Sequence, residues 1–156
     1  MSCRSGAKPP RRQTPPGSIT FAVQAKGIHH LGVAVEDLEE AVETYRSVFG
    51  AELEHRETMQ SQGVEAVAVR VGASRVEFLR ALGDDTPVGK FIANRGPGMH
   101  HVAYEVSDLH GHLNRLAEQG VELVDVEPRA GLFGLEVAFI HPHAMHGVLA
   151  ELVAVA

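Results

Sequence analysis

The sequence predicts an α+β fold in which two βαβββ modules pair into one curved sheet. A repeat is the first observation: GIHHLGVAVEDL at 27–38 returns as GMHHVAYEVSDL at 98–109. The second is that each copy is followed by a helical pattern and then by three strand-like segments. Neither half alone could bury both faces of its own sheet, so the two halves are expected to pack around a shared concavity.

The first element of each module is a strand whose two faces differ, because side chains alternate along a strand. In IHHLGVAV the face with His30 is small, and the face with His29 is large and branched. MHHVAYEV repeats this pattern, with His101 on the small face and His100 on the large one. The large face should pack against a helix, so His29 and His100 are expected to pack there or to support the residues around them.

A helix follows each strand. Asp37 and Asp108, or the residue before each of them, could cap its start. LEEAVETYRSVFG and LHGHLNRLAEQG both place apolar residues at helical spacing, and they end at Gly50 and Gly120. The sequence therefore predicts one amphipathic helix in each module.

Three strand-like segments complete each module. They are AELEHRETM, VEAVAVRVG and SRVEFLRAL in the first module, at about 26–82, and VELVDVEP, LEVAFIHP and GVLAELVAV in the second, at about 98–155. The linker at 83–97 should carry a short helix near 88–94. We expect 25–156 to form a single domain, and the Pro-, Ser- and Arg-rich residues 1–24 to be a disordered tail.

Composition limits the classes of function. The 156-residue chain carries a formal net charge of −6, which argues against a general nucleic-acid surface. No apolar run approaches the roughly 18 residues of a membrane helix. The single cysteine, Cys3, fits a reducing compartment. These features predict a cytoplasmic protein that binds neither nucleic acid nor membrane.

Polar residues mark the small faces of otherwise apolar strands: His30, Glu77, His101 and Glu151. A carboxylate in a buried strand is costly unless it is paired or binds a metal. Two histidines and two carboxylates suit one divalent transition metal with an octahedral preference, such as Co²⁺, Mn²⁺, Fe²⁺, Ni²⁺ or Zn²⁺. Each module would supply one histidine from its first strand and one glutamate from its last. Two metal positions would remain for the oxygen atoms of a ligand.

Around these residues the chain resembles the methylmalonyl-CoA epimerase family of the vicinal oxygen chelate, or glyoxalase, superfamily. The resemblance covers about 26–153 and rests on HHLGVAV, VGASRVEFL, VGKFIANRGPGMHHVAYEV and FIHPHAMHGVLAEL. It implies the four metal ligands above, although many members carry Gln where this chain has Glu77. It also implies an acyl-CoA substrate, a homodimer and a role in propionate metabolism.

The resemblance implies an isomerase that epimerises (2R)/(2S)-methylmalonyl-CoA in a metal-dependent reaction. The C2 proton would be removed and returned through an enolate that the metal stabilises. Inversion needs a base on one face of C2 and an acid on the other, and the resemblance offers Glu151 as one of them. No GxGxxG motif is present to bind a nicotinamide or flavin cofactor.

Glu65 is the candidate for the second proton carrier. Some family members have a Glu four residues after the Gln of QGV, whereas here Glu65 follows Gln62 by three residues and Ala66 holds the usual position. A shift of one residue turns a side chain to the other face of a strand, so the position of Glu65 argues against it. A water or a histidine is the alternative. Residues that could meet anionic groups of the substrate are Lys90, Arg129, His143 and His146.

Other functions remain open at this point. A glyoxalase I-like lyase or isomerase acting on a hemithioacetal, or on another acyl-CoA thioester, would share the metal site, although the ending HPHAMHGVLAEL favours the epimerase. An extradiol dioxygenase would use two His and one Glu, so Glu77 as a fourth ligand argues against it. Retention of all four ligands argues against a metal-free binding module.

Overall fold

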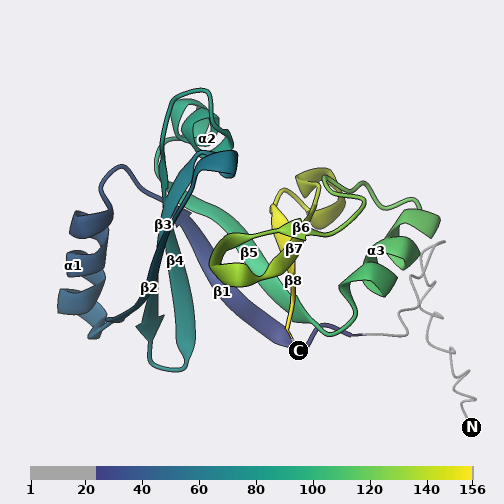
Figure 1. Ribbon diagram of the computed structural model, residues 1–156, viewed down its shortest axis with the longest axis horizontal. Helices are drawn as coiled ribbons and strands as arrows, with labels where there is room; N and C mark the ends of the chain where they lie inside the picture. Colours follow the sequence, from purple (N-terminus) through teal and green to yellow (C-terminus); the bar gives the residue numbers. More distant parts are fainter. Residues whose placement is uncertain (1–23, 156) are drawn as a thin grey trace, which may run out of the picture.

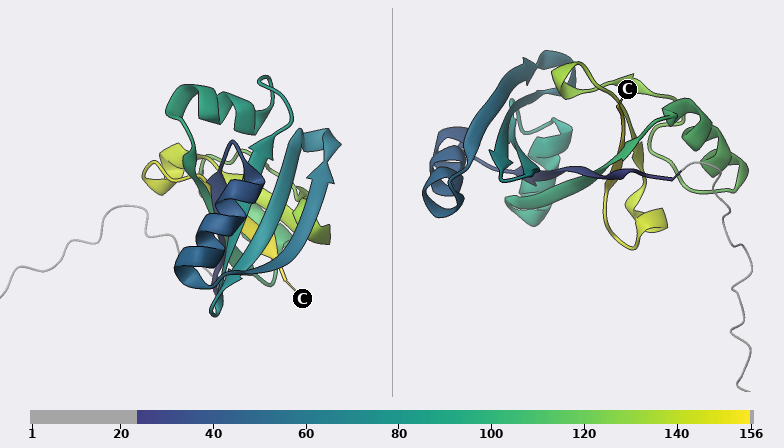
Figure 2. Two further views of the ribbon diagram at one scale, coloured as in Figure 1. Left: turned by 90° about the vertical axis from the view of Figure 1, so that its left-hand side faces the viewer. Right: turned by 90° about the horizontal axis from the view of Figure 1, so that it is seen from below.

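The computed structural model describes residues 24–155, so the predicted tail lies outside the described residues except for Gln24. One eight-stranded sheet has the strand order β2-β3-β4-β1-β5-β8-β7-β6 (Figure 1). The sheet curls strongly, with α1 packed at one end and α3 at the other (Figure 2). The predicted fold, two βαβββ modules paired into one curved sheet, is confirmed.

The elements follow the repeat. The first module contains β1 (Gly27–Ala34), α1 (Leu38–Phe49), β2 (Glu52–Met59), β3 (Val64–Val71) and β4 (Ser74–Ala81). The second contains β5 (Gly98–Val106), α3 (Leu109–Glu118), β6 (Arg129–Ala130), β7 (Glu136–Ile140) and β8 (Ala150–Ala154). The linker holds α2 (Pro87–Arg95), and short 3-10 turns lie at η1 (Gln60–Gln62), η2 (Leu132–Gly134) and η3 (Pro142–Met145).

The two modules join through their first strands. β1 and β5 pair antiparallel at the centre of the sheet. β1 also pairs in parallel with β4, and β5 pairs in parallel with β8, so each module makes the same connection. None of the helices formed by residues 24–155 is long and apolar enough to span a bilayer.

Aspartate side chains start both amphipathic helices. The carboxylate of Asp37 accepts a hydrogen bond from the Glu40 N–H, and that of Asp108 accepts one from the Gly111 N–H. These bonds satisfy backbone groups that have no partner inside a helix. At the other end of α1, Gly50 adopts φ 66°, a left-handed conformation that glycine adopts without steric cost.

Helices α1 and α3 cover the outer face of the sheet, opposite the concave face that carries the four polar residues, whereas α2 packs on the concave side beside Ala66 and Leu79. Leu38 and Val42 of α1 pack with Phe78 and its neighbours on β3 and β4. Leu109 and Leu113 of α3 pack in the same way over β7 and β8. Burial of these apolar side chains is the main force that holds each helix against the sheet.

The strand predicted at 121–128 does not form. The backbone N–H groups of Val124 and Asp125 both donate to the Phe139 carbonyl, and the Asp125 carboxylate accepts the Phe139 N–H. Because a side chain takes the place of a backbone partner, no regular ladder can develop there. The second strand of this module is instead β6, which begins only after Pro128.

Candidate metal centre and active site

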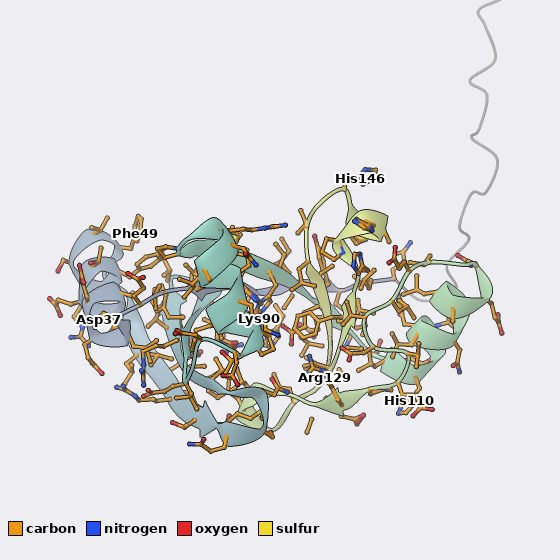
Figure 3. All side chains as sticks on the ribbon, turned by 90° about the horizontal axis from the view of Figure 1, so that it is seen from above. Asp37, Phe49, Lys90, His110, Arg129 and His146 are labelled. Carbon is orange, nitrogen blue, oxygen red and sulfur yellow. The ribbon has the colours of Figure 1, made fainter. Side chains whose placement is uncertain are left out.

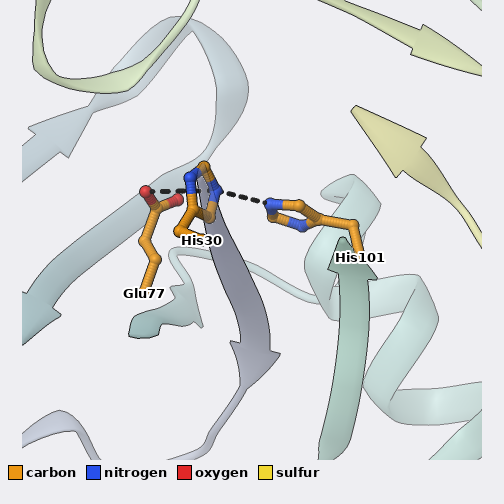
Figure 4. A group of neighbouring side chains, drawn as sticks. All are labelled: His30, Glu77 and His101. Atoms are coloured by element: carbon orange, nitrogen blue, oxygen red, sulfur yellow. Dashed lines mark hydrogen bonds and ion pairs between the residues drawn. The ribbon is translucent and has the colours of Figure 1, made fainter. Parts of the chain in front are cut away.

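The four predicted ligands meet on the concave face of the sheet. His30, Glu77, His101 and Glu151 come from β1, β4, β5 and β8, and each is at most 6% exposed. The Nε2 atoms of His30 and His101 lie 3.0 Å apart, and His101 Nε2 lies 2.8 Å from Glu151 Oε2. His30 Nε2 lies 3.4 Å from Glu151 Oε2 and 3.6 Å from Glu77 Oε2. Figure 4 shows the His30 ring between Glu77 and His101.

Strand register brings these side chains together. Gly32 stands between Glu77 on one neighbouring strand and His101 on the other. Ala103, its counterpart in the second module, stands between His30 and Glu151. A Cβ atom at Gly32 would lie 2.1 Å from Cε1 of His101, so glycine leaves the space that this imidazole fills.

Each doubled histidine contains a β-bulge. Between β1 and β5 the pairing skips His29 in one strand and His100 in the other. The Nδ1 atom of His29 lies 2.8 Å from that of His30, and the Nδ1 atoms of His100 and His101 are 2.9 Å apart. When the Nε2 atom of a histidine binds a metal, its Nδ1 atom carries the proton and can donate it to such a neighbour. The first histidine of each pair therefore supports the ligand.

Of the two expectations for His29 and His100, support of the neighbouring histidines agrees with the structure. Packing on the large outer face is wrong, because a bulge adds one residue and breaks the alternation. His100 lines the pocket and packs edge-on against Phe91 of α2 at 4.8 Å. Burial lowers the pKa of His100 to about 4, so its imidazole is neutral at physiological pH. The same doubled histidine in both repeats is the signal that pointed to these supporting residues.

Electrostatics at the centre favour a bound cation. Burial alone would lower the pKa of His30, but the hydrogen bond to Glu151 and the charge of Glu77 outweigh it and raise that pKa. Burial raises the pKa of Glu77. Burial also opposes ionisation of Glu151, but hydrogen bonds from His101 and His30 lower its pKa to about 2. Without a cation, these buried groups can balance their charge only with protons.

The donor set fits a divalent transition metal. Metal–nitrogen and metal–oxygen bonds of about 2.1 Å place neighbouring ligand atoms of an octahedron about 3 Å apart. Four of the distances between ligand atoms lie between 2.8 and 3.6 Å, close to that spacing, and the donor atoms of His30, Glu77 and His101 all lie within 4.8 Å of one another. The two carboxylates supply the two negative charges that a divalent ion would neutralise.

A cavity of about 420 Å³ opens onto this centre. All four ligands line it, and Glu77 and Glu151 are the carboxylates in its lining. Val64, Leu79 and Leu132 contribute apolar walls. The modules meet at its edge, where the Gln62 side-chain amide donates to the Ala130 carbonyl at 3.0 Å.

The residues expected to contact anionic substrate groups separate into two sets. Arg129 lines the cavity, where its guanidinium lies 5.2 Å from the Phe139 ring centre and forms a salt bridge with Asp125 at 3.2 Å. Lys90, His143 and His146 are exposed and do not line this cavity. Figure 3 shows Lys90 and Arg129 over the middle of the molecule and His146 at its rim.

Glu65 lies outside the cavity. Its carboxylate faces α1 on the outer side of the sheet, where it pairs with Arg80 and with Arg56. Both arginines lower the pKa of Glu65, with the hydrogen bond from Arg80 the stronger cause. The neighbouring Ala66 is fully buried in the cluster that includes Leu79, on the concave side. The one-residue shift seen in the sequence therefore removes Glu65 from the cavity.

The family model of the Glyoxalase/Bleomycin resistance protein/Dioxygenase superfamily matches residues 29–139. The chain belongs to this superfamily.

Its relatives confirm the resemblance seen in the sequence. Methylmalonyl-CoA epimerase, mitochondrial, from Dictyostelium discoideum is 33% identical over 137 residues, which cover 87% of this chain and 82% of the relative. Ethylmalonyl-CoA/methylmalonyl-CoA epimerase from Cereibacter sphaeroides is 35% identical over 127 residues, or 80% of this chain and 95% of the relative. A solved structure of methylmalonyl-CoA epimerase in complex with methylmalonyl-CoA and NH₄⁺ has a TM-score of 0.81 at 36% identity, covering 85% of this chain and 96% of that one.

Proposed function

We propose that this chain is a methylmalonyl-CoA epimerase, an isomerase that inverts C2 of methylmalonyl-CoA by removing and returning one proton. The observation that carries the proposal is a pair of buried carboxylates, one from each module, that line one cavity beside two histidines. Inversion requires proton carriers on both faces of C2, and a twofold-related pair meets that need. The names of the relatives and the acyl-CoA ligand of the solved structure support the same reaction.

The residues that would hold the metal are His30, Glu77, His101 and Glu151. When bound, a divalent cation stabilises the negative charge that develops on the substrate oxygen atoms as C2 loses its proton. The donor set suits Co²⁺, Mn²⁺, Ni²⁺, Fe²⁺ or Zn²⁺. Elemental analysis of protein purified without added metal identifies the ion.

Glu151 is the first proton carrier in this proposal, and Glu77 is the second. Glu77 takes that role because Ala66 leaves the usual position of the family's second glutamate without a carboxylate, while Glu65 faces the opposite side of the sheet. Many family members have Gln where this chain has Glu77, and a Gln cannot carry a proton. Compared with those members, this chain lacks a carboxylate at Ala66 and has an additional one at Glu77. The alternative to Glu77 as the second proton carrier is His100 or a water molecule.

Replacing Glu77 with Gln tests this assignment. The amide keeps an oxygen donor for the metal but cannot exchange a proton, so we expect metal content to remain and inversion to fall at least 100-fold. Deuterium from D₂O should still enter C2 from the side of Glu151 with retention of configuration. E65Q makes the same chemical change on the outer face and serves as the matched control. If E77Q inverts C2 at the normal rate, another group is the second carrier.

The substrate is tested with a panel of thioesters. Purified protein is incubated with (2R)- and (2S)-methylmalonyl-CoA, ethylmalonyl-CoA and a glutathione hemithioacetal, and the products are resolved by stereospecific assay. We expect both methylmalonyl-CoA isomers to reach the same equilibrium mixture and the hemithioacetal to remain unchanged. Turnover of the hemithioacetal with no epimerisation would make the chain a glyoxalase I-like enzyme instead. Faster turnover of ethylmalonyl-CoA would reassign the acyl group.

Assembly and location are parts of the same proposal. We infer a homodimer from the family resemblance, and sedimentation equilibrium should give twice the chain mass of 16.8 kDa. We infer a cytoplasmic location from the single cysteine and the composition. The Dictyostelium relative is named mitochondrial, so cell fractionation with an antibody against the chain is the deciding measurement.

A further inference from the structure

A second cluster of metal-binding side chains lies on the surface, outside the cavity. Glu122, His141 and His143 each offer one donor atom, and the three atoms lie within 4.8 Å of one another. Nδ1 of His141 is 3.7 Å from one oxygen of Glu122, and Nδ1 of His143 is 3.5 Å from the other. Both imidazoles therefore direct the same ring nitrogen toward one carboxylate.

The spacing suits a tetrahedral ion. Bonds of about 2.1 Å from a Zn²⁺ ion place two ligand atoms roughly 3.4 Å apart. Each imidazole nitrogen lies within a few tenths of an ångström of that value from one of the two Glu122 oxygens, so the carboxylate would bind through both oxygens or turn to present one of them. Imidazole nitrogens with one carboxylate are a donor set that Zn²⁺, Ni²⁺ and Cu²⁺ bind well.

The backbone holds the three donors in place. The His141 N–H donates to the Glu122 carbonyl at 3.0 Å, and the adjacent residues Leu123 and Ile140 form a β-bridge. His141 and His143 flank Pro142 at the start of η3, with ring centres 4.4 Å apart. Little chain ordering is needed for binding, because both segments are already fixed to each other.

We propose that Glu122, His141 and His143 form a second metal site that binds Zn²⁺, Ni²⁺ or Cu²⁺ at the surface, with water completing the coordination. A metal ion bound to His141 Nδ1 would replace the hydrogen bond that this atom accepts from the backbone N–H of His143. The ion joins the segment after α3 to the turn that leads into β8. The site is independent of the centre in the cavity, since it shares none of its ligands.

Zn²⁺ titration of chelator-treated protein against a chromophoric competitor tests the site. We expect two Zn²⁺ per wild-type chain. Glu122→Gln and His143→Ala should each weaken the second binding event at least tenfold while the first remains. His101→Ala should give the converse result, with loss of the event at the cavity and retention of the surface one.

His110→Ala is the matched control. His110 is an exposed histidine that lies 3.8 Å from Glu136 and belongs to no cluster of three donor residues within the described part of the chain (labelled in Figure 3). This variant should still bind two Zn²⁺. Thermal unfolding in chelator checks that the variants at Glu122 and His143 fold as the wild type does. A wild-type chain whose only Zn²⁺ is lost in His101→Ala, or a Glu122→Gln variant whose Zn²⁺ binding is unchanged, would overturn the proposal and leave ordinary ion pairs in its place.

Discussion

Replacing Gly32 with alanine would place a methyl group against the His101 imidazole. The added carbon would lie 2.1, 2.3 and 2.6 Å from Cε1, Nδ1 and Nε2 of that ring. Ordinary contact begins near 3.4 Å, so the ring would have to move by more than 1 Å. His101 is 3% exposed and lies in the centre of the sheet, where the packed surroundings resist such a shift.

Two opposing contributions determine how G32A changes the free energy of unfolding. Gly32 does not have a positive φ, so an alanine backbone is allowed there and by itself would stabilise the fold by about 0.4–1 kcal/mol. Overpacking a buried site costs about 1–3 kcal/mol. We therefore expect G32A to lose about 1–2 kcal/mol of unfolding free energy in chelator. Because the ring that moves belongs to one of the proposed metal ligands, metal affinity should fall by about 100-fold, at the upper end of what losing a partner of a ligand costs.

Urea unfolding in chelator and a metal competition titration measure these two effects separately. Ala103→Gly, at the equivalent position of the second module, is the matched control. It removes a methyl group without creating a clash, so metal affinity should change by less than about threefold while stability falls by about 1 kcal/mol. If G32A is more stable than the wild type and binds metal equally well, the predicted close approach of Gly32 to His101 is wrong.

Three further variants probe the cavity and the charges around it. E65Q should change kcat by less than twofold in the epimerase assay, because Glu65 faces the outer side of the sheet; a large loss would return it to the active site. R129A should raise the KM for methylmalonyl-CoA about tenfold with little change in kcat, as expected for one lost charge-assisted hydrogen bond. Hydrogen bonds from Arg75 and Arg70 lower the pKa of Glu54 to about 2 from an ordinary value of 4.5. The charged form of Glu54 therefore stabilises the fold above pH 4.5. Because the ion pairs of Glu54 are partly exposed and weaken in salt, E54Q should lower the free energy of unfolding by only about 1 kcal/mol at pH 7. Unfolding curves of E54Q and wild type should converge as the pH falls from 4.5 to 2, and a difference that persists at pH 2 would contradict this cause.

The candidate metal ligands could be selected from the sequence because two periodicities agreed. Strand alternation placed His30 and His101 on the small faces, and the repeat placed Glu77 and Glu151 in matching last strands. The helix starts and stops were readable for a similar reason, since Asp37 and Gly50 act through local geometry. Local rules that are repeated in both modules thus predicted the candidate centre and most of the fold.

Features that depend on a single inserted residue or on a side chain replacing a backbone group were not predictable. The bulges at His29 and His100 leave no mark in a binary pattern, because one extra residue changes the face of a side chain without changing its type. The missing strand at 121–128 has a suitable apolar pattern, but Asp125 takes the hydrogen bond that a strand would make. Charge alone also could not separate Arg129 from His143, since only the folded loops determine which of them reaches the cavity.

Exchange of the C2 proton of methylmalonyl-CoA with D₂O bears most directly on metal-dependent epimerisation. The experiment follows deuterium incorporation and loss of stereochemical purity together, in metal-loaded protein, in chelator-treated protein and in His101→Ala. We expect exchange with inversion in the loaded protein, and rates near those of buffer alone in the other two. Exchange at the buffer rate in protein shown to hold a metal, or full exchange in His101→Ala, would contradict the proposed reaction at this centre.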